Sequence, residues 1–199
     1  MILLRRESRA LIVLSGGESR RFGSEDKGLY RYRGIPLVKR IVDSLGPLAN
    51  EAIVQVAQGK AEEYRRILES GVLVQEDASR FSGPLSGLSE ALRLVKSDIV
   101  LLTPCDLPDV RTTLFELLIS RLFGHDAAMP RIGDYPEPIT AVYQTAKLRT
   151  AVDAELRASR LKLSGILRHL DVAFVSESEL GESGIPIETL RSMNAPSRS

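Results

Sequence analysis

The residues best suited to chemistry lie in one segment near the N-terminus, Leu14 to Lys27, which reads Leu-Ser-Gly-Gly-Glu-Ser-Arg-Arg-Phe-Gly-Ser-Glu-Asp-Lys. Gly16 and Gly17 come directly after a short apolar run. Glycine lets a backbone approach a phosphate because no Cβ intervenes, and consecutive N–H groups then form a concave anion site. Three basic side chains add positive charge to the loop: Arg20, Arg21 and Lys27. Such groups are suited to stabilising a pyrophosphate leaving group.

The common phosphate-binding motifs do not describe this loop. A Walker A loop has four residues between its glycines and then Lys, whereas here five residues separate Gly17 from Gly23 and Ser24 follows. The dinucleotide fingerprint Gly-x-Gly-x-x-Gly is also missing from the loop. On composition alone, a solvent-exposed turn with incidental arginines remains the alternative interpretation.

Two acidic positions are candidates for metal or nucleotide binding. Asp106 stands in Pro-Cys-Asp-Leu-Pro after the very apolar stretch 98–103. A carboxylate at the carboxyl end of a parallel strand points into the crevice where such sheets bind ligands, and one carboxylate plus substrate phosphates suffices for Mg²⁺. Asp77 lies in the polar segment 76–83. The alternative for Asp106 is a turn or helix-capping aspartate.

Composition and charge limit the classes of partner. The chain has 199 residues, with 27 Lys plus Arg against 26 Asp plus Glu, so net charge gives no case for nucleic acid or an acidic membrane as partner. Cys105 is the single cysteine, which excludes an internal disulfide and fits a reducing cytoplasm. The apolar run 11–14 is too short for a signal peptide or a membrane span.

Apolar runs alternate with amphipathic stretches along the chain, and this rhythm predicts βαβ units and a mainly parallel sheet. We expect strands at 10–14, 29–32, 52–57, 72–75, 98–103, 127–130, 139–144 and 172–175. We expect helices at 36–45, 61–68, 84–95, 112–123, 146–157 and 162–170. The long loop would begin at Ser15, and Pro36 would open the first helix. The sequence shows no interdomain linker.

The pattern Gly-Gly-x-Ser-Arg-Arg-Phe-Gly-x-x-Asp-Lys-Gly resembles the signature of sugar-nucleotide-type nucleotidyltransferases, and within them the molybdenum cofactor guanylyltransferases (MobA type). The Pro-Cys-Asp-x-Pro motif, the segment 76–88, the segment 134–143 and the segment 192–196 are similar to further motifs of that family. Ser15 and Phe22 replace a usual Ala and Met, and Ser24 stands where Gly is common. Ser192 and Ala195 depart from the family's Asn-x-Asn-Thr-Pro.

The resemblance implies an α/β fold, Rossmann-like, with three layers (α/β/α) and a mainly parallel sheet of the nucleotide-diphospho-sugar transferase type. It implies one nucleotidyltransferase domain over residues 1–199, with 1–110 mainly binding GTP and 111–199 mainly binding the acceptor. The nucleotide-binding residues it implies are Leu14, Ser15, Gly16, Gly17, Lys27, Gln58, Asp77 and Asp106. The catalytic residues it implies are Lys27, Arg21 and Asp106, with Asp106 holding Mg²⁺. The acceptor-side candidates are Arg21, Arg160 and Asn194.

The reaction implied by the resemblance is transfer of GMP from GTP to the phosphate of molybdopterin, or of the molybdenum cofactor, with release of pyrophosphate. Transient contact with cofactor-biosynthesis proteins or molybdoenzymes would fit that role. Gly16-Gly17 favours guanylyl over cytidylyl relatives, which usually have Ala-Gly there. The alternatives are a guanylyltransferase acting on cobinamide phosphate, a cytidylyl-specific relative, and a nucleotide-binding regulatory protein without catalysis. Intact Lys27, Asp77 and Asp106 argue against the last of these.

Overall fold

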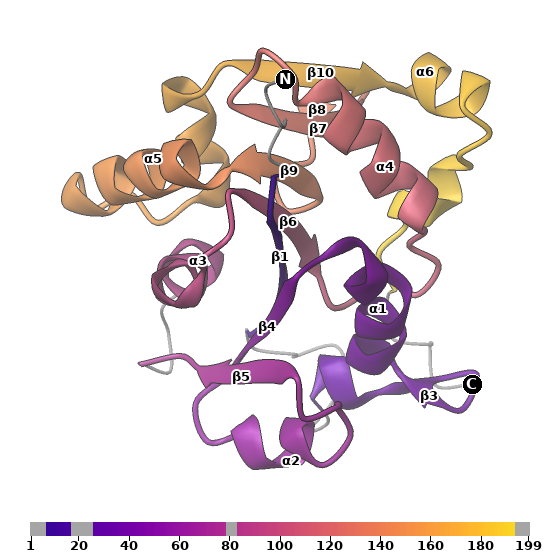
Figure 1. Ribbon diagram of the computed structural model, residues 1–199, viewed down its shortest axis with the longest axis vertical. Coiled ribbons are helices and arrows are strands. Elements are labelled where there is room, and N and C mark those ends of the chain that lie inside the picture. Colours follow the sequence, from indigo (N-terminus) through magenta and orange to yellow (C-terminus); the bar gives the residue numbers. More distant parts are fainter. Residues whose placement is uncertain (1–6, 17–25, 79–82, 194–199) are drawn as a thin grey trace, which may run out of the picture.

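The computed structural model describes residues 7–16, 26–78 and 83–193, and within them one large sheet organises the chain (Figure 1). Its eight strands run in the order β10-β7-β9-β6-β1-β4-β5, with β8 paired to β7. Their bounds are β1 Arg9–Ser15, β4 Glu51–Val56, β5 Val72–Glu76, β6 Ile99–Pro104, β7 Ala127–Ile132, β8 Tyr135–Pro136, β9 Ala141–Gln144 and β10 Val172–Ser176. A separate hairpin joins β2 Arg31–Tyr32 to β3 Ile35–Pro36.

The strand directions bring the candidate residues to one edge of the sheet. β1 pairs in parallel with both β4 and β6, and β4 pairs in parallel with β5. β9 is antiparallel to both β6 and β7, so β7 and its parallel neighbour β10 again run in the direction of β1. The carboxyl ends of β1, β4, β5 and β6 therefore share an edge, which is where open α/β sheets bind ligands.

Helices cover both faces of the sheet (Figure 1). The α-helices are α1 Leu37–Leu45, α2 Ala61–Arg65, α3 Gly83–Leu94, α4 Thr112–Arg121, α5 Thr145–Arg157 and α6 Glu177–Glu182. Short 3-10 helices are η1 Lys27–Leu29, η2 Gly46–Leu48, η3 Leu163–His169 and η4 Ile187–Leu190. Side chains from α1, α2 and α4 join one core cluster, and side chains from α3 and α5 join the other. The three-layer α/β fold expected from the sequence is confirmed.

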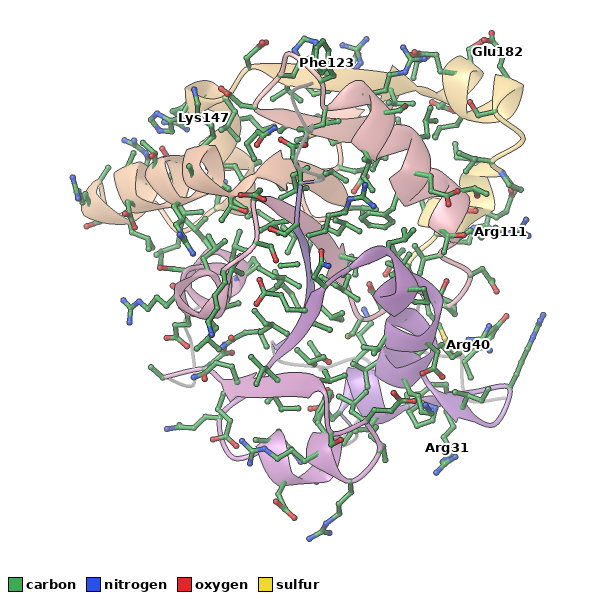
Figure 2. All side chains as sticks on the ribbon, viewed as in Figure 1. Arg31, Arg40, Arg111, Phe123, Lys147 and Glu182 are labelled. Carbon is green, nitrogen blue, oxygen red and sulfur yellow. The ribbon has the colours of Figure 1, made fainter. Side chains whose placement is uncertain are left out.

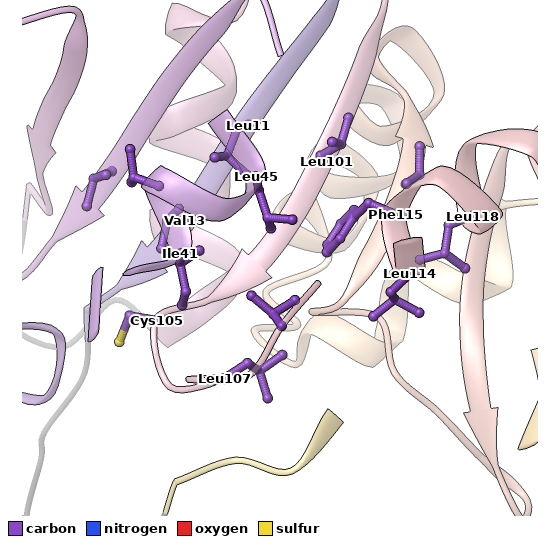
Figure 3. Packing of buried hydrophobic residues seen from close by; sticks show 14 of the residues in the cluster. Leu11, Val13, Ile41, Leu45, Leu101, Cys105, Leu107, Leu114, Phe115 and Leu118 are labelled. Carbon is purple, nitrogen blue, oxygen red and sulfur yellow. The ribbon is translucent and has the colours of Figure 1, made fainter. Parts of the chain in front are cut away.

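β1 divides its side chains between these two clusters because successive residues of a strand point to opposite faces. Leu11 and Val13 pack with α1 and α4 side chains such as Leu45 and Phe115, as Figure 3 shows. Ile12 packs in the opposite cluster with α3 and α5. Full burial of one such side chain contributes about 1.5–3 kcal/mol, so the apolar residues 10–14 of β1 hold the strand at the centre of the sheet.

Many charged side chains lie at the rim of the molecule. Figure 2 labels Arg31, Arg111, Lys147 and Glu182 there, all of them exposed.

Over the part of the chain that the structure describes, no helix is both long and apolar enough to cross a membrane.

Several element boundaries differ from the sequence prediction. Ser15 ends β1 rather than beginning the loop, because it still pairs with Val56. Pro36 ends β3 and occupies the N-cap position before α1, so it does not open the helix. Of the strand expected at 29–32, only residues 31–32 form a strand. The helix expected at 162–170 is a 3-10 helix. The sequence prediction missed α6, although Ser176 and Glu179 form a capping box at its start.

Candidate functional site

Lys27 and Asp106 meet at the carboxyl edge of the sheet. The Lys27 ammonium forms an ion pair with Asp106 Oδ2, and the Ser192 hydroxyl donates a hydrogen bond to the same oxygen. The backbone N–H of Met193 donates to the Asp106 carbonyl at 2.8 Å. The Asp106 side chain is 12% exposed and that of Lys27 is 28% exposed, so the carboxylate is largely shielded from water and the ammonium only partly. Ser192 and Met193, at the end of the described chain, therefore pack against Asp106.

β6 delivers Asp106 to this place. The strand is buried up to Thr103, and the Cys105 N–H then donates to the Leu14 carbonyl at 3.0 Å, which continues the pairing with β1 past the end of the strand. Burial raises the pKa of the Cys105 thiol to about 12. A thiol held protonated is a poor nucleophile, so the buried Cys105 neighbours the site without serving as its nucleophile.

A hydrogen-bonded chain of three side chains fixes the turn that carries Lys27. Asp26 caps η1 by accepting from the Gly28 N–H at 2.9 Å. The Tyr64 hydroxyl, from α2, donates to Asp26 Oδ1 at 2.5 Å, and Ser15 Oγ donates in turn to the Tyr64 oxygen at 2.6 Å. Burial raises the pKa of Asp26 and of Tyr64, so the tyrosine remains a donor. A Cβ on Gly28 would collide with both hydroxyl groups.

Asp77 forms a second cluster at the same edge, just past the end of β5. Its N–H donates to the Val56 carbonyl at 2.8 Å. Gln55 Nε2 donates to Asp77 Oδ1 at 2.8 Å and to Glu90 Oε2 at 3.2 Å. Burial, as the largest effect, raises the pKa of the Asp77 carboxyl, while the Gln55 hydrogen bond lowers it. Asp77 is thus a half-buried acceptor whose direction is set by its neighbours.

Two glycines make room for the Asp77 carboxylate. A Cβ on Gly16 would lie 2.7 Å from Asp77 Oδ2, and a Cβ on Gly87 would lie 3.0 Å from Asp77 Oδ1. Glycine inside a helix costs about 1 kcal/mol relative to alanine. The close approach of Asp77 accounts for that cost at Gly87 in α3. The start of the glycine-rich loop is therefore in contact with Asp77.

The other residues that the sequence indicated for nucleotide or acceptor binding do not all lie at this edge. Leu14 and Ser15 end β1 beside this edge, and Gln58 is exposed in the turn after β4. Gly17, Arg21 and Asn194 lie outside the described residues. Sequence reasoning did not single out Gln55, Tyr64 or Glu90. A polar residue inside the buried strand Ile-Val-Gln-Val was the one available signal for Gln55.

Arg160 is engaged in an ion-pair cluster between α5 and η3. Its guanidinium donates to both carboxylate oxygens of Glu155, at 3.0 and 2.9 Å, and His169 Nε2 lies 2.8 Å from Glu155 Oε1. Glu155 has no exposed surface, and its hydrogen bonds with Arg160 lower the carboxyl pKa to about 2. These contacts give Arg160 a structural role, so its acceptor role stays a prediction that this cluster does not support.

A mainly parallel α/β sheet with a glycine, a lysine and an aspartate at its carboxyl edge is typical of a nucleotide-binding enzyme. The family model described as the MobA-like NTP transferase domain matches residues 11–173. The chain therefore belongs to the MobA-like NTP transferase family, which confirms the resemblance found in its motifs.

Relatives and solved structures agree with this assignment. The molybdenum cofactor guanylyltransferase of Shewanella putrefaciens is 30% identical over 76% of this chain and 77% of its own length. A probable molybdenum cofactor guanylyltransferase of Bacillus licheniformis is 29% identical over 85% of each chain. Molybdopterin-guanine dinucleotide biosynthesis protein A of Archaeoglobus fulgidus has a TM-score of 0.76 at 22% identity, over 94% of this chain and 93% of its own.

The same fold occurs in an enzyme named for a different base. The 4-diphosphocytidyl-2C-methyl-D-erythritol synthase of Anaerococcus prevotii has a TM-score of 0.67 at 13% identity, covering 85% of this chain and 87% of its own. The fold alone therefore does not select the nucleotide, and the base must be argued from side chains.

Proposed function

We propose that this chain transfers GMP from GTP to the terminal phosphate of molybdopterin and releases pyrophosphate. The observation that carries the proposal is the ion pair of Lys27 and the largely buried Asp106 at the carboxyl edge of the sheet. The names of its relatives indicate guanylyl transfer and the molybdenum cofactor, and GTP and molybdopterin are the substrates that we infer from them. The proposal places the reaction in the cytoplasm, as expected from the single buried cysteine.

The chemistry requires no covalent intermediate. The attacking phosphate oxygen is already anionic, so it forms the new bond to the α-phosphorus of GTP without a general base, and the bond to pyrophosphate breaks. Catalysis then depends on positioning and on stabilising charge at the leaving group. Lys27 is held by the η1 turn, and its ammonium would stabilise that charge.

The residues present fit Mg²⁺ through one carboxylate. Among residues 7–16, 26–78 and 83–193, no group of three or more acidic, His or Cys side chains could hold a metal ion. Mg²⁺ usually keeps several waters and is held by one or two carboxylates plus substrate phosphates, which Asp106 satisfies. The ion would neutralise charge on the GTP phosphates. Asp106 would hold it at the edge where the phosphates are expected.

The division of labour between the two halves is part of the proposal. Leu14, Lys27, Asp77 and Asp106 all belong to residues 1–110, which would bind GTP. The contact of Ser192 with Asp106 supports placing the acceptor next to the nucleotide, because it brings residues of the 111–199 half to the proposed metal ligand. The acceptor phosphate would then reach the α-phosphorus from that side.

The experiment is a screen of the four nucleoside triphosphates with molybdopterin and Mg²⁺, following pyrophosphate release. We expect turnover with GTP only and none with Lys27→Met, which serves as the inactive control. Turnover with CTP would move the protein to the cytidylyl branch. Transfer to cobinamide phosphate in place of molybdopterin would change the acceptor, and GTP binding without transfer to either would indicate a regulatory protein.

A further inference from the structure

One polar side chain ties three elements together beside Asp77. Gln55 lies in β4 between buried valines and is 1% exposed. Its amide nitrogen donates both to Asp77, after β5, and to Glu90 in α3. An ionised carboxylate only accepts hydrogen bonds, so the NH₂ end of the amide must face both acids. The orientation of Gln55 is therefore fixed by chemistry, and Gln55 fixes Asp77 Oδ1 in return.

Glu90 holds the backbone on the other side of Asp77. The Ala78 N–H donates to Glu90 Oε2 at 3.0 Å and to Oε1 at 3.2 Å. Gln55 and Glu90 thus restrain Asp77 both through its side chain and through the next peptide group. Gly16 and Gly87 lie so close to the two carboxylate oxygens that a Cβ at Gly16 would clash with Oδ2 and a Cβ at Gly87 would crowd Oδ1. A side chain at either glycine would press against the Asp77 carboxylate in this position.

The arrangement is not one that packing alone would produce. Gln55 Oε1 is buried and accepts no hydrogen bond from the described residues. Leaving a buried polar atom unpaired is unfavourable, and an apolar side chain of similar size would fill β4 without that cost. Two half-buried acids on either side of the amide add like-charge repulsion. A network with these costs is better explained by what it does for Asp77.

We infer that Gln55 and Glu90 are positioning residues that orient the Asp77 carboxylate toward the base and thereby set the preference for guanine. The inference rests on the proposed function, in which Asp77 contacts the nucleotide. Guanine places the N1–H and N2–H donors side by side, and an oriented carboxylate accepts both. Cytosine offers ring acceptors beside one amino group and cannot match it. The hydrogen bond from Gln55 also lowers the pKa of Asp77 and so favours the ionised acceptor.

Binding measurements test the inference without any acceptor. Calorimetry would give the Kd of GTP, inosine triphosphate (which lacks the N2 amino group) and CTP for wild type, Gln55→Met and Asp77→Asn. We expect Gln55→Met to weaken GTP about 10-fold or more, inosine triphosphate less, and CTP little, since the effect acts on the donors of guanine. Gln144→Met is the matched control, a half-buried glutamine at the end of β9, and should change nothing.

The double variant Gln55→Met/Asp77→Asn shows whether Gln55 acts through Asp77. If it does, the double variant binds GTP as Asp77→Asn does, with no further loss. A further loss in the double variant, or equal losses for all three nucleotides, would show a merely structural role and overturn the inference. Glu90→Leu, on the partly exposed face of α3, gives a second variant with the same expected pattern if Gln55→Met does not fold.

The same series separates this inference from the proposed function. A wild-type protein that prefers GTP but transfers nothing to molybdopterin would refute the proposed reaction, and the binding pattern of the variants would still support Gln55. A wild-type protein that binds CTP as tightly as GTP would refute the inference whatever the acceptor.

Discussion

Replacing Asp106 with asparagine separates the proposed metal ligand from a structural aspartate. The change keeps the size of the side chain and removes the charge that faces Lys27 and the proposed Mg²⁺. If Asp106 only capped a turn, Asn would replace it well, because Asn and Asp cap about equally. If it holds a cation, the neutral amide would bind it poorly, and Mg²⁺-dependent turnover should fall.

The structure sets the size of the two effects. The Lys27 and Asp106 side chains are 28% and 12% exposed, so the pair lies between a surface ion pair of about 0–1 kcal/mol and a charged hydrogen bond of about 1.5–3 kcal/mol. Asn still offers one acceptor oxygen, so we expect a loss of about 1–2 kcal/mol. For a chain of this length that lowers Tm by about 2–8 °C. The rate should fall much more, by about 10²–10³.

The assay is a Mg²⁺ titration of guanylyl transfer for wild type and Asp106→Asn, with a melting curve for each. Total stability of about 5–15 kcal/mol leaves the variant folded at 25 °C, so lost turnover there reports chemistry. Asp43→Asn is the control, because Asp43 pairs with Lys39 on the exposed side of α1. An Asp106→Asn enzyme with unchanged rate and Mg²⁺ dependence would refute the assignment and leave Asp77 as the next candidate ligand.

Three further substitutions test the surroundings of the site. Gly16→Ala places a Cβ against Asp77 and should weaken GTP binding about 10-fold with little effect on CTP, measured by calorimetry. Tyr64→Phe leaves Asp26 without its hydroxyl donor, so we expect a loss of about 1–3 kcal/mol in urea unfolding and a lower kcat; an unchanged kcat would show that the turn needs no such support. For Glu155→Gln, the Tm deficit relative to wild type should be full above pH 4.5 and shrink toward pH 2, because the native pKa lies below its ordinary value; a constant deficit contradicts this.

The sequence predicted those parts of the fold that depend on short-range patterns of apolar and polar residues. β1 and β6 are apolar runs because both faces of a central parallel strand are buried, and the runs located them within one or two residues. The strand before Asp106 and the loop before Lys27 also imply that the two side chains share an edge, because parallel strands end together. The ion pair between them bears out that part of the interpretation.

The missing parts depend on contacts between distant segments. Nothing near Ser192 in the sequence indicates that its hydroxyl reaches Asp106, which is 86 positions away. Gln55 and Glu90 are ordinary residues of a strand and a helix until the packing of α3 on β4 brings them together. The resemblance makes Arg160 an acceptor-side candidate, and no local pattern indicates that folding gives it the buried carboxylate of Glu155 as a partner.

The ion pair between Lys27 and Asp106 also explains how the fold holds a positive and a negative side chain side by side before ligands of opposite charge bind. An unpaired charge on the largely buried Asp106 would destabilise the fold, and Lys27 is its partner before substrate arrives. A phosphate bound by Lys27 would leave the Asp106 carboxylate available to the proposed cation, and a cation on Asp106 would release Lys27 to a phosphate. The two binding events would therefore favour each other, and by thermodynamic linkage the coupling would be the same in either order. Removing either side chain should weaken this coupling as well as the binding of its own ligand.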